Sequence, residues 1–364
     1  MTLQNSAAQS PSTIDFGHRA KAEEVAASLW RHERPLAILL VGSVAEGRAT
    51  PDSDIDLVVL KPGLPAMTMT TRLDGGFRVS VEEYPAERFW WSDTKPRLSM
   101  AQLREAGRLA RGALLYSAWP DYESASAGWR NAVLDQDECI SLLVTASESL
   151  DAVHNDDETS FERLWWLQGS FSAAAMLSLS LAPCRFQKPK WVARDLAVHD
   201  SVLSDLLPVT FRTPVENGLV SETEWLRNHF DDACRARGFP GTDTVTFAVD
   251  ETDWHLAYGY RTLLDARSLG AAGDVPGCQY TLFAAARLLL AILVERSGSA
   301  AWPESATVWR DDMLQRLAAV DMAQLDRTAA ALGEHIDRLT NTYAALYQDG
   351  EIDAATDASA STAP

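Results

Sequence analysis

The sequence predicts an α+β fold in which a small mixed sheet comes first and an all-α helical bundle follows. Up to about residue 96, short apolar runs alternate with segments rich in Gly, Pro and Asp, a pattern typical of strands and turns. From about residue 97, apolar residues recur at spacings of three and four, as in Leu325, Ala329, Leu332 and Ile336. This change of period divides the chain into two domains of different class.

Hydrophobic periodicity and turn residues predict the elements of the first domain in order. We expect a helix over residues 16–31, buried strands over 36–41 and 55–60, and a hairpin that joins 67–73 to 77–84. The hairpin follows from the Asp-Gly-Gly turn at 74–76, which lies between two alternating segments. Between the two buried strands, Gly42 and Ser43 begin a short helix.

The second part contains long stretches rich in Ala, Leu, Arg and Glu, separated by loops that carry Pro, Gly or Asp. We expect helices over 97–116, 128–153, 158–182, 190–206, 221–237, 251–269, 276–297 and 311–347. Both ends of the chain are small and polar, so they cannot bury enough apolar area to offset the entropy of ordering. The expected organisation is a disordered N-terminus (1–13), a first domain (14–96), a helical domain (97–349) and a disordered acidic tail (350–364).

Charge and composition exclude several classes of protein. The 364 residues include 32 Lys+Arg and 51 Asp+Glu, a net charge of −19 that opposes approach to a phosphate backbone. The four cysteines are far apart and have no metal-ligand spacing, which favours a reducing compartment. Neither a signal peptide nor a membrane-spanning apolar stretch is visible. We therefore expect a cytoplasmic protein with no nucleic-acid or membrane partner.

Residues 36–60 carry the pattern that indicates chemistry. The first buried strand leads into Gly42 and Ser43, where a bare backbone, a helix start and a hydroxyl can seat a phosphate. Asp54 and Asp56 alternate with apolar residues on the next strand, so both carboxylates lie on one face. Two adjacent carboxylates need a cation, and Mg²⁺ is commonly held by carboxylates together with nucleotide phosphates. The segment predicts a nucleotide site.

This combination resembles the signature of the DNA polymerase beta-like nucleotidyltransferase superfamily, here Gly42-Ser43 followed by Ser53-Asp54-Ile55-Asp56-Leu57. The resemblance covers about the first 95 residues. The helical remainder is similar only in outline to the accessory domain of aminoglycoside nucleotidyltransferases. The resemblance implies that Asp54 and Asp56 hold Mg²⁺, as a pair of ions, and that Gly42, Ser43 and Ser53 contact ATP or another nucleoside triphosphate.

The family uses a third carboxylate on a neighbouring strand, as a metal ligand or as a base. Alternation in residues 77–85 puts Ser80 and Glu82 on one face and Glu83 on the other. We favour Glu82 as the third ligand. If the register instead places Ser80 there, metal binding or base catalysis is in doubt. A further alternative is that Glu82 is merely an exposed strand residue.

A triphosphate leaving group also needs positive charge. The segment 184–191 gathers basic residues before a helix in an otherwise acidic chain. By the resemblance, Lys188 or Lys190 is a candidate contact for the nucleotide phosphates, and Arg48 is a weaker one. The alternative is a solvated loop whose lysines contact nothing.

Together these observations predict a Mg²⁺-dependent nucleotidyltransferase that moves a nucleoside monophosphate, AMP from ATP, to a hydroxyl of a small molecule and releases pyrophosphate. The net charge favours a cationic acceptor, and the resemblance points to an aminoglycoside-like one. Two alternatives are a toxin-type enzyme that modifies protein or tRNA, and a degenerate member that binds a nucleotide or a partner without catalysis.

Overall fold

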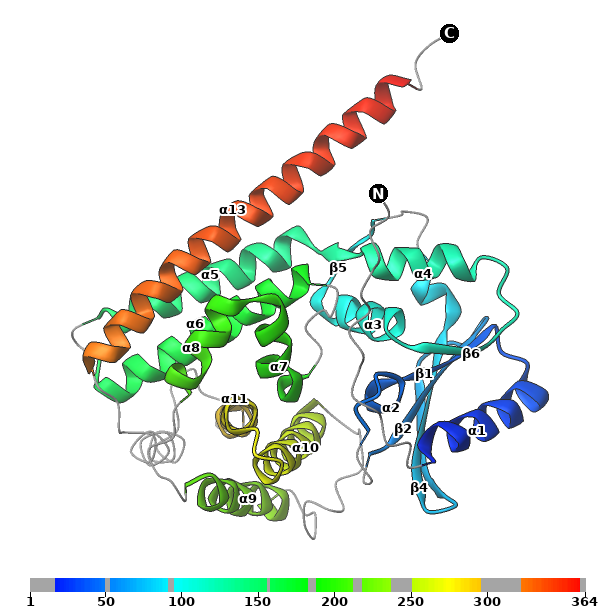
Figure 1. Cartoon of the computed structure of the whole chain (residues 1–364), viewed down its shortest axis with the longest axis horizontal. Helices are drawn as coiled ribbons and strands as arrows, with labels where there is room; N and C mark the ends of the chain where they lie inside the picture. Colours follow the sequence, from blue (N-terminus) through cyan, green and yellow to red (C-terminus); the bar gives the residue numbers. More distant parts are fainter. Residues whose placement is uncertain are drawn as a thin grey trace, which may run out of the picture. The chain divides into compact units, whose positions relative to one another are not determined.

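The computed structural model describes residues 17–49, 53–90, 95–155, 158–182, 188–211, 218–236, 251–295 and 322–360 (Figure 1). The chain divides into two compact units after Asp135. The first unit contains the sheet and the second is helical, so the α+β class expected from the sequence is confirmed. The expected N-terminal disorder of residues 1–13 lies outside the described residues.

The first unit is built on a five-stranded mixed sheet with the order β3-β4-β2-β1-β6. Its helices and strands are α1 (His18–Glu33), β1 (Ala37–Val41), α2 (Gly42–Ala45), β2 (Ile55–Lys61), β3 (Thr68–Asp74), β4 (Phe77–Pro85), η1 (Ala86–Phe89), β5 (Arg97–Leu98), α3 (Met100–Ala110), β6 (Ala113–Ser117), α4 (Tyr122–Asn131) and β7 (Val133–Leu134). Within the sheet, β2 and β4 run parallel and the other pairs are antiparallel. The expected strands and hairpin are present, close to the expected bounds.

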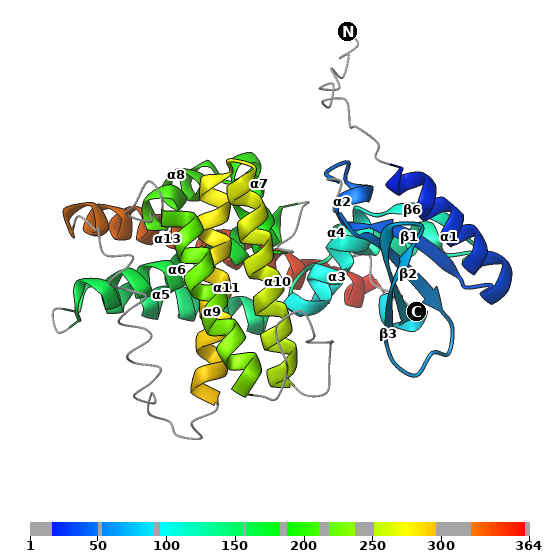
Figure 2. The same ribbon diagram turned by 90° about the horizontal axis from the view of Figure 1, so that it is seen from below.

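Helices cover both faces of this sheet. Alternate residues of β1, β2 and β4 form an apolar core with Ala22, Val25 and Ala26 of α1. The opposite face carries Ser80 and Glu82 of β4, and α3 lies on that side of the sheet (Figures 1 and 2). One face is therefore an apolar core, while the other combines apolar packing with charged side chains.

The boundary between the units lies later than residue 96. The stretch 97–116 was expected to be one helix of the second domain, but α3 ends at Ala110 and residues 113–117 become β6. This segment pairs with the edge of β1, which would otherwise leave backbone groups without partners. Similarly, β7 interrupts the helix expected over 128–153 because it pairs with β5. Tertiary pairing here outweighs local helix propensity.

The second unit is a helical bundle, as expected. Its described helices are α5 (Gln136–Val153), α6 (Ser160–Leu181), α7 (Pro189–His199), α8 (Ser201–Thr210), α9 (Gly218–Ala236), α10 (Glu251–Ala271), α11 (Val275–Glu295) and α13 (Met322–Ala360). Helix α5 packs on α6, and α10 packs on both α9 and α11 (Figure 2). None of the helices in the ranges given above is long and apolar enough to cross a membrane.

Two features of this bundle differ from the expectations. The helix expected over 190–206 is split at Asp200, which caps the start of α8 by accepting the N–H of Leu203 at 3.1 Å. Helix α13 continues to Ala360 and so includes most of the tail expected to be disordered. Alanine, the strongest helix former, recurs there at 354, 355, 358 and 360.

A buried polar cluster joins three helices of the second unit. Oδ2 of Asp200 accepts the hydroxyl of Ser178 on α6 and lies 2.8 Å from Nε2 of His335 on α13. Arg338 lies on the far side of the His335 ring, 3.2 Å from Nδ1. Burial alone would raise the pKa of Asp200, but the bonds from His335, Ser178 and the Leu203 N–H outweigh it and lower that pKa. The ionised carboxylate is therefore the form that holds α6, α8 and α13 together.

Replacing Asp200 with Asn should destabilise the chain by about 1–3 kcal/mol at neutral pH, because the charge-assisted bonds to His335 and Ser178 are lost. Because the pKa of Asp200 is lower in the folded than in the unfolded chain, its carboxylate stabilises the protein at pH values above the unfolded-state pKa, near 4. This stabilisation is lost as the pH falls through the folded-state pKa. Urea unfolding between pH 7 and pH 3 should thus show a smaller acid-dependent loss for Asp200→Asn than for wild type. Asp205→Asn, at an exposed position of the same helix, is the control and should behave like wild type.

Candidate functional site

The turn from β1 into α2 brings the backbone against a carboxylate of β2. Val41 lies opposite Asp56 in the antiparallel pairing of the two strands. The next residue, Gly42, has a φ of +74°, which side chains rarely tolerate. A Cβ on Gly42 would also lie 2.6 Å from Oδ2 of Asp56, too close for a real contact. Glycine is required here for two separate reasons.

The two aspartates share one face of the sheet, as alternation predicts. Ile55 and Leu57, on either side of Asp56, are fully buried in the core beneath α1. Oδ1 of Asp54 lies 3.8 Å from Nη1 of Arg78 on β4. The next residue on β4, Val79, belongs to that same core, so Arg78 lies on the opposite face. Asp54 therefore faces away from α1, on the side of Asp56.

Helix α1 holds the chain just before the aspartates. His18 is 2% exposed, and its Nε2 lies 3.0 Å from the carbonyl oxygen of Ser53. The His18 ring also packs edge-on against Phe77 at the start of β4, with ring centroids 5.0 Å apart. This contact positions Ser53, and with it Asp54, relative to the sheet.

The structure changes the reason for expecting phosphate to bind at Gly42 and Ser43. Helix α2 is a single turn of four residues, so few peptide dipoles align and its macrodipole is small. The carbonyl of Ser43 accepts the N–H of Arg48 at 2.7 Å, which closes the loop after the helix. What remains at this position is the bare backbone of Gly42 beside Asp56, followed by Ser43.

The strand register answers which residue takes the third-carboxylate position, and the preference for Glu82 needs correction. In the parallel pairing of β2 with β4, Asp56 lies beside Ser80, whereas Glu82 lies beside Val58. Two residues along a strand correspond to about 6.6 Å. Within the described ranges, no three or more His, Cys, Asp or Glu side chains form a group that could hold a metal ion. Glu83 points to the other face, as expected, and pairs with Lys61.

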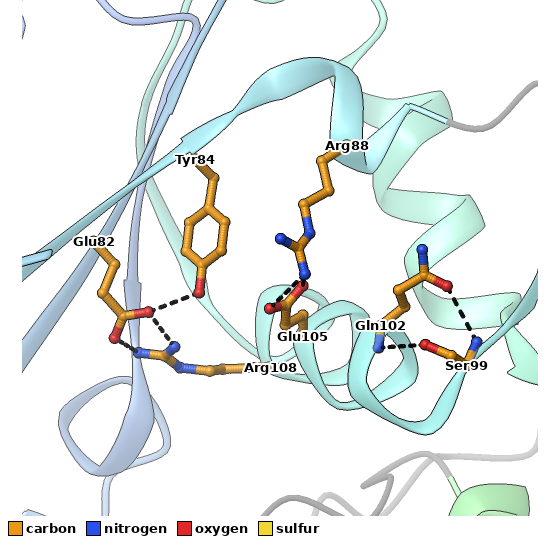
Figure 3. A network of polar contacts seen from close by, with 7 residues as sticks. All are labelled: Glu82, Tyr84, Arg88, Ser99, Gln102, Glu105 and Arg108. Carbon is orange, nitrogen blue, oxygen red and sulfur yellow. Dashed lines mark hydrogen bonds and ion pairs between the residues drawn. The ribbon is translucent and has the colours of Figure 1, made fainter. Parts of the chain in front are cut away.

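Glu82 is 8% exposed and is bound by neighbours of its own unit (Figure 3). Nη1 and Nη2 of Arg108, on α3, each donate to one of its carboxylate oxygens at 2.6 Å. The hydroxyl of Tyr84 donates to the same carboxylate at 3.0 Å. Burial and the Glu82 charge raise the pKa of Tyr84. Burial works against the charge of Arg108, but Glu82 and, more weakly, Asp56 outweigh it and raise the pKa of that guanidinium.

Helix α3 is anchored at its start and along its length. A capping box joins Ser99 and Gln102, each bonding the backbone N–H of the other (Figure 3). Further along, Glu105 pairs with Nη2 of Arg88 at 2.9 Å. Burial raises the pKa of Glu105 although Arg88 opposes the shift. These anchors fix the helix that carries Arg108.

A second ion-pair group lies directly after α2. Glu46 lies between two arginines, with Oε2 3.2 Å from Nη1 of Arg48 and Oε1 3.4 Å from Nη2 of Arg111. The side chains of all three residues are at most 19% exposed. The weaker phosphate candidate, Arg48, thus belongs to the same unit as the aspartates, and Arg111 joins it from the end of α3.

The lysines expected on the phosphates both lie in the second unit. Lys188 is the residue immediately before α7, and Pro189 takes the first helical position. Nζ of Lys190 lies 2.8 Å from Oδ1 of Asp265 on α10 and 5.3 Å from the centre of the Trp191 ring. Lys190 is therefore paired within its own unit. The preceding residues 183–187 lie outside the described ranges.

Sequence reasoning missed the arginines of α3. Their segment was assigned to the helical domain, so their charge was not connected with the aspartates. A signal was nevertheless present, because Arg104, Arg108 and Arg111 recur at spacings of four and three in a chain with a large excess of acid. Such a stripe indicates one basic helix face.

A family model matches the part of the first unit that carries the aspartates. Residues 20–85, which run from α1 through β4, match the family model described as a nucleotidyltransferase domain. Among solved structures, the chain is similar to a nucleotidyltransferase-like protein from Exiguobacterium sibiricum, with 12% identity and a TM-score of 0.31 over 88% of this chain and 91% of that one. No curated protein matches the chain.

Replacing Gly42 with Ala should destabilise the chain by clearly more than the strain of a positive φ alone, which costs about 1–2 kcal/mol. The added methyl group must also displace the carboxylate of Asp56. Gly63→Ala is the matched control, because Gly63 has a similar φ of +67° but nothing within 4 Å of its Cβ position. Equal losses in the free energy of unfolding for the two variants would contradict the close approach of Gly42 to Asp56.

Proposed function

We propose, from the premise that residues 20–85 of this chain are a nucleotidyltransferase domain, that the protein transfers AMP from ATP to a hydroxyl of a small molecule and releases pyrophosphate. The observation that carries this proposal is the contact between Gly42 and Asp56. It places a bare backbone turn beside two carboxylates that share one face, within the matched residues. A phosphate seat next to a cation seat suits a nucleoside triphosphate.

The two carboxylates suit a magnesium ion that the protein holds through only a few ligands. Asp54 and Asp56 supply hard oxygen ligands, and Ser80 rather than a third carboxylate lies beside Asp56. Magnesium is usually held by one or two carboxylates, with phosphate oxygens and water completing the octahedron. This ligand set suits one ion better than the pair implied by the family resemblance. When bound, the ion neutralises phosphate charge and orients the α-phosphate.

The chain's own residues position the donor. Gly42 admits the phosphates close to the backbone, and Ser43 donates a hydrogen bond to a phosphate oxygen. His18 fixes Ser53 and so keeps Asp54 beside Asp56. In the transfer, the acceptor oxygen forms a bond to the α-phosphorus while the bond to the pyrophosphate oxygen breaks. Pyrophosphate leaves with that electron pair, and the acceptor's proton passes to water.

Glu82 is not the base in this scheme. Its two oxygens accept three hydrogen bonds, two from Arg108 and one from Tyr84, which use three of the roughly four lone-pair sites of a carboxylate. The residue instead positions Arg108.

The acceptor is proposed from charge. A net charge of −19 raises the local concentration of cations near the surface, so a polycationic hydroxyl compound of the aminoglycoside type is the first class to screen. The same charge disfavours a nucleic-acid acceptor.

A second candidate function is nucleotide binding without catalysis. The observation that favours it is the serine at the third-carboxylate position, together with the pairing of Glu82 to Arg108. This candidate predicts Mg²⁺-dependent nucleotide binding with no pyrophosphate release in the presence of any acceptor.

Asp56→Asn should abolish Mg²⁺-dependent ATP binding and lower transfer at least about 100-fold, since metal stabilisation of phosphate charge is worth several kcal/mol. Calorimetric titration with each of the four ribonucleoside triphosphates, with Mg²⁺ and with EDTA, measures binding and identifies the donor. Pyrophosphate release in the presence of cationic hydroxyl compounds measures transfer. Asp74→Asn, at the end of β3 in a pair with Lys21, is the control and should match wild type. Full activity of Asp56→Asn would show that the metal assignment is wrong.

Ser80→Asp should strengthen Mg²⁺ binding, because it places a third carboxylate beside Asp56 in the strand register. Without metal the variant should be less stable than wild type, because Ser80 is 1% exposed and an unpaired carboxylate there repels Asp56. Thr71→Asp is the matched control. Thr71 lies opposite Ser80 but one strand further from Asp56, so its carboxylate should not change Mg²⁺ affinity. Equal Mg²⁺ affinity of Ser80→Asp and wild type would contradict the assigned site.

A further inference from the structure

We propose that Arg108 of α3 and Arg111, directly after α3, bind the polyphosphate of the donor nucleotide. This inference rests on the proposed function and names the source of positive charge that the leaving pyrophosphate needs. It replaces Lys188 and Lys190 of the second unit with two residues of the same unit as the aspartates.

The first support is the orientation of Arg108. Its guanidinium lies on the sheet face that carries Asp56, because Glu82 alternates on that face with Ser80, the register neighbour of Asp56. The influence of Asp56 on the pKa of Arg108 is in keeping with this placement. Glu82 takes one N–H from each terminal nitrogen, which leaves three of the five N–H donors of an arginine. In the described part of the chain, Arg108 makes no other hydrogen bond.

The second support is Arg111, which directly follows the last residue of α3. Its Nε and Nη2 atoms are buried and form no hydrogen bond within the described ranges, although Nη2 lies 3.4 Å from Glu46. The end of α3 is close to the end of β1, since a Cβ on Gly112 would lie 3.0 Å from Cγ1 of Val41. Val41 immediately precedes Gly42. Arg111 therefore places donors near the end of β1, where the phosphates are proposed to bind, and these donors make no hydrogen bond within the described residues.

The third support is energetic. A buried ion pair gains little stability over an apolar pair of similar size, because both charges lose their hydration. The Glu82–Arg108 pair is thus poorly explained as a device for stability alone. Arginine also suits the task, since its charge is permanent and its planar fork matches phosphate oxygens. In a chain of net charge −19, carboxylate partners are a means of holding such cations in place before phosphate arrives.

The test uses inorganic tripolyphosphate, which has the charge of the donor but neither base nor sugar. Calorimetric titration of the full chain in Mg²⁺ should show binding to wild type. Arg108→Gln and Arg111→Gln should each weaken it about tenfold, the usual effect of losing a charge-assisted hydrogen bond. Arg88→Gln removes another arginine that pairs with a carboxylate of α3, and it should bind tripolyphosphate like wild type.

The Glu82→Gln variant tests whether Arg108 contacts phosphate or serves only to stabilise the fold. This variant breaks the ion pair but retains Arg108, and it removes a negative charge that competes with phosphate. It should bind tripolyphosphate about two- to threefold more tightly than wild type. The double variant Glu82→Gln/Arg108→Gln leaves no buried charge unpaired, so it remains folded if Arg108→Gln alone does not, and it should bind as weakly as Arg108→Gln.

Three results would overturn the inference: no tripolyphosphate binding by wild type, wild-type binding by Arg108→Gln, or equal losses in Glu82→Gln and Arg108→Gln. A parallel titration with ATP distinguishes this failure from failure of the proposed function. If ATP binding requires Mg²⁺ and Asp56 but not Arg108, only the arginine assignment is wrong. If tripolyphosphate binding requires Arg108 but ATP does not bind, the arginine assignment holds and the nucleotide function is wrong.

Discussion

The close contact between Gly42 and Asp56 is the constraint on which the candidate site depends. It joins the end of β1 to the start of β2, and it exists only because residue 42 has no side chain and a positive φ. The buried neighbours Ile55 and Leu57 anchor β2 from the other face, so the carboxylate of Asp56 cannot turn toward the core. Two features therefore determine where the Asp56 carboxylate lies beside the backbone turn. One is the packing of β2 against α1, and the other is the glycine at position 42.

The acidic character of the chain makes the placement of its few cations informative. Arg108 of α3, Arg111 directly after α3 and Arg48 after α2 belong to the same unit as the aspartates, and each has a carboxylate partner. The partners keep the arginines ordered and reduce the local net charge. In the proposed function, a triphosphate would bring several negative charges to the aspartates, and these arginines would supply fixed positive charge.

Alternation of residues was sufficient to predict the faces of the strands but not their register. It correctly placed Asp54 with Asp56 and separated Ser80 and Glu82 from Glu83, because those relations depend only on the period of a strand. Whether Ser80 or Glu82 lies beside Asp56 depends on the pairing of β2 with β4, which the intervening hairpin and its contacts determine. The same limit applies to β6, where pairing with β1 overrides a helical pattern. Arg108 was missed for this reason, since its neighbours follow from the position of α3 on the sheet.

The register has a chemical consequence. A serine beside Asp56 leaves two carboxylates for metal, while the glutamate two residues further along is engaged by a guanidinium. Compared with a site of three carboxylates, this site has one carboxylate ligand fewer and one permanent positive charge more on the same face. Because an arginine cannot be removed by chelation or diluted away, its charge is present before substrate binds. In the proposed function, this arrangement would favour capture of the polyphosphate by the protein's own residues.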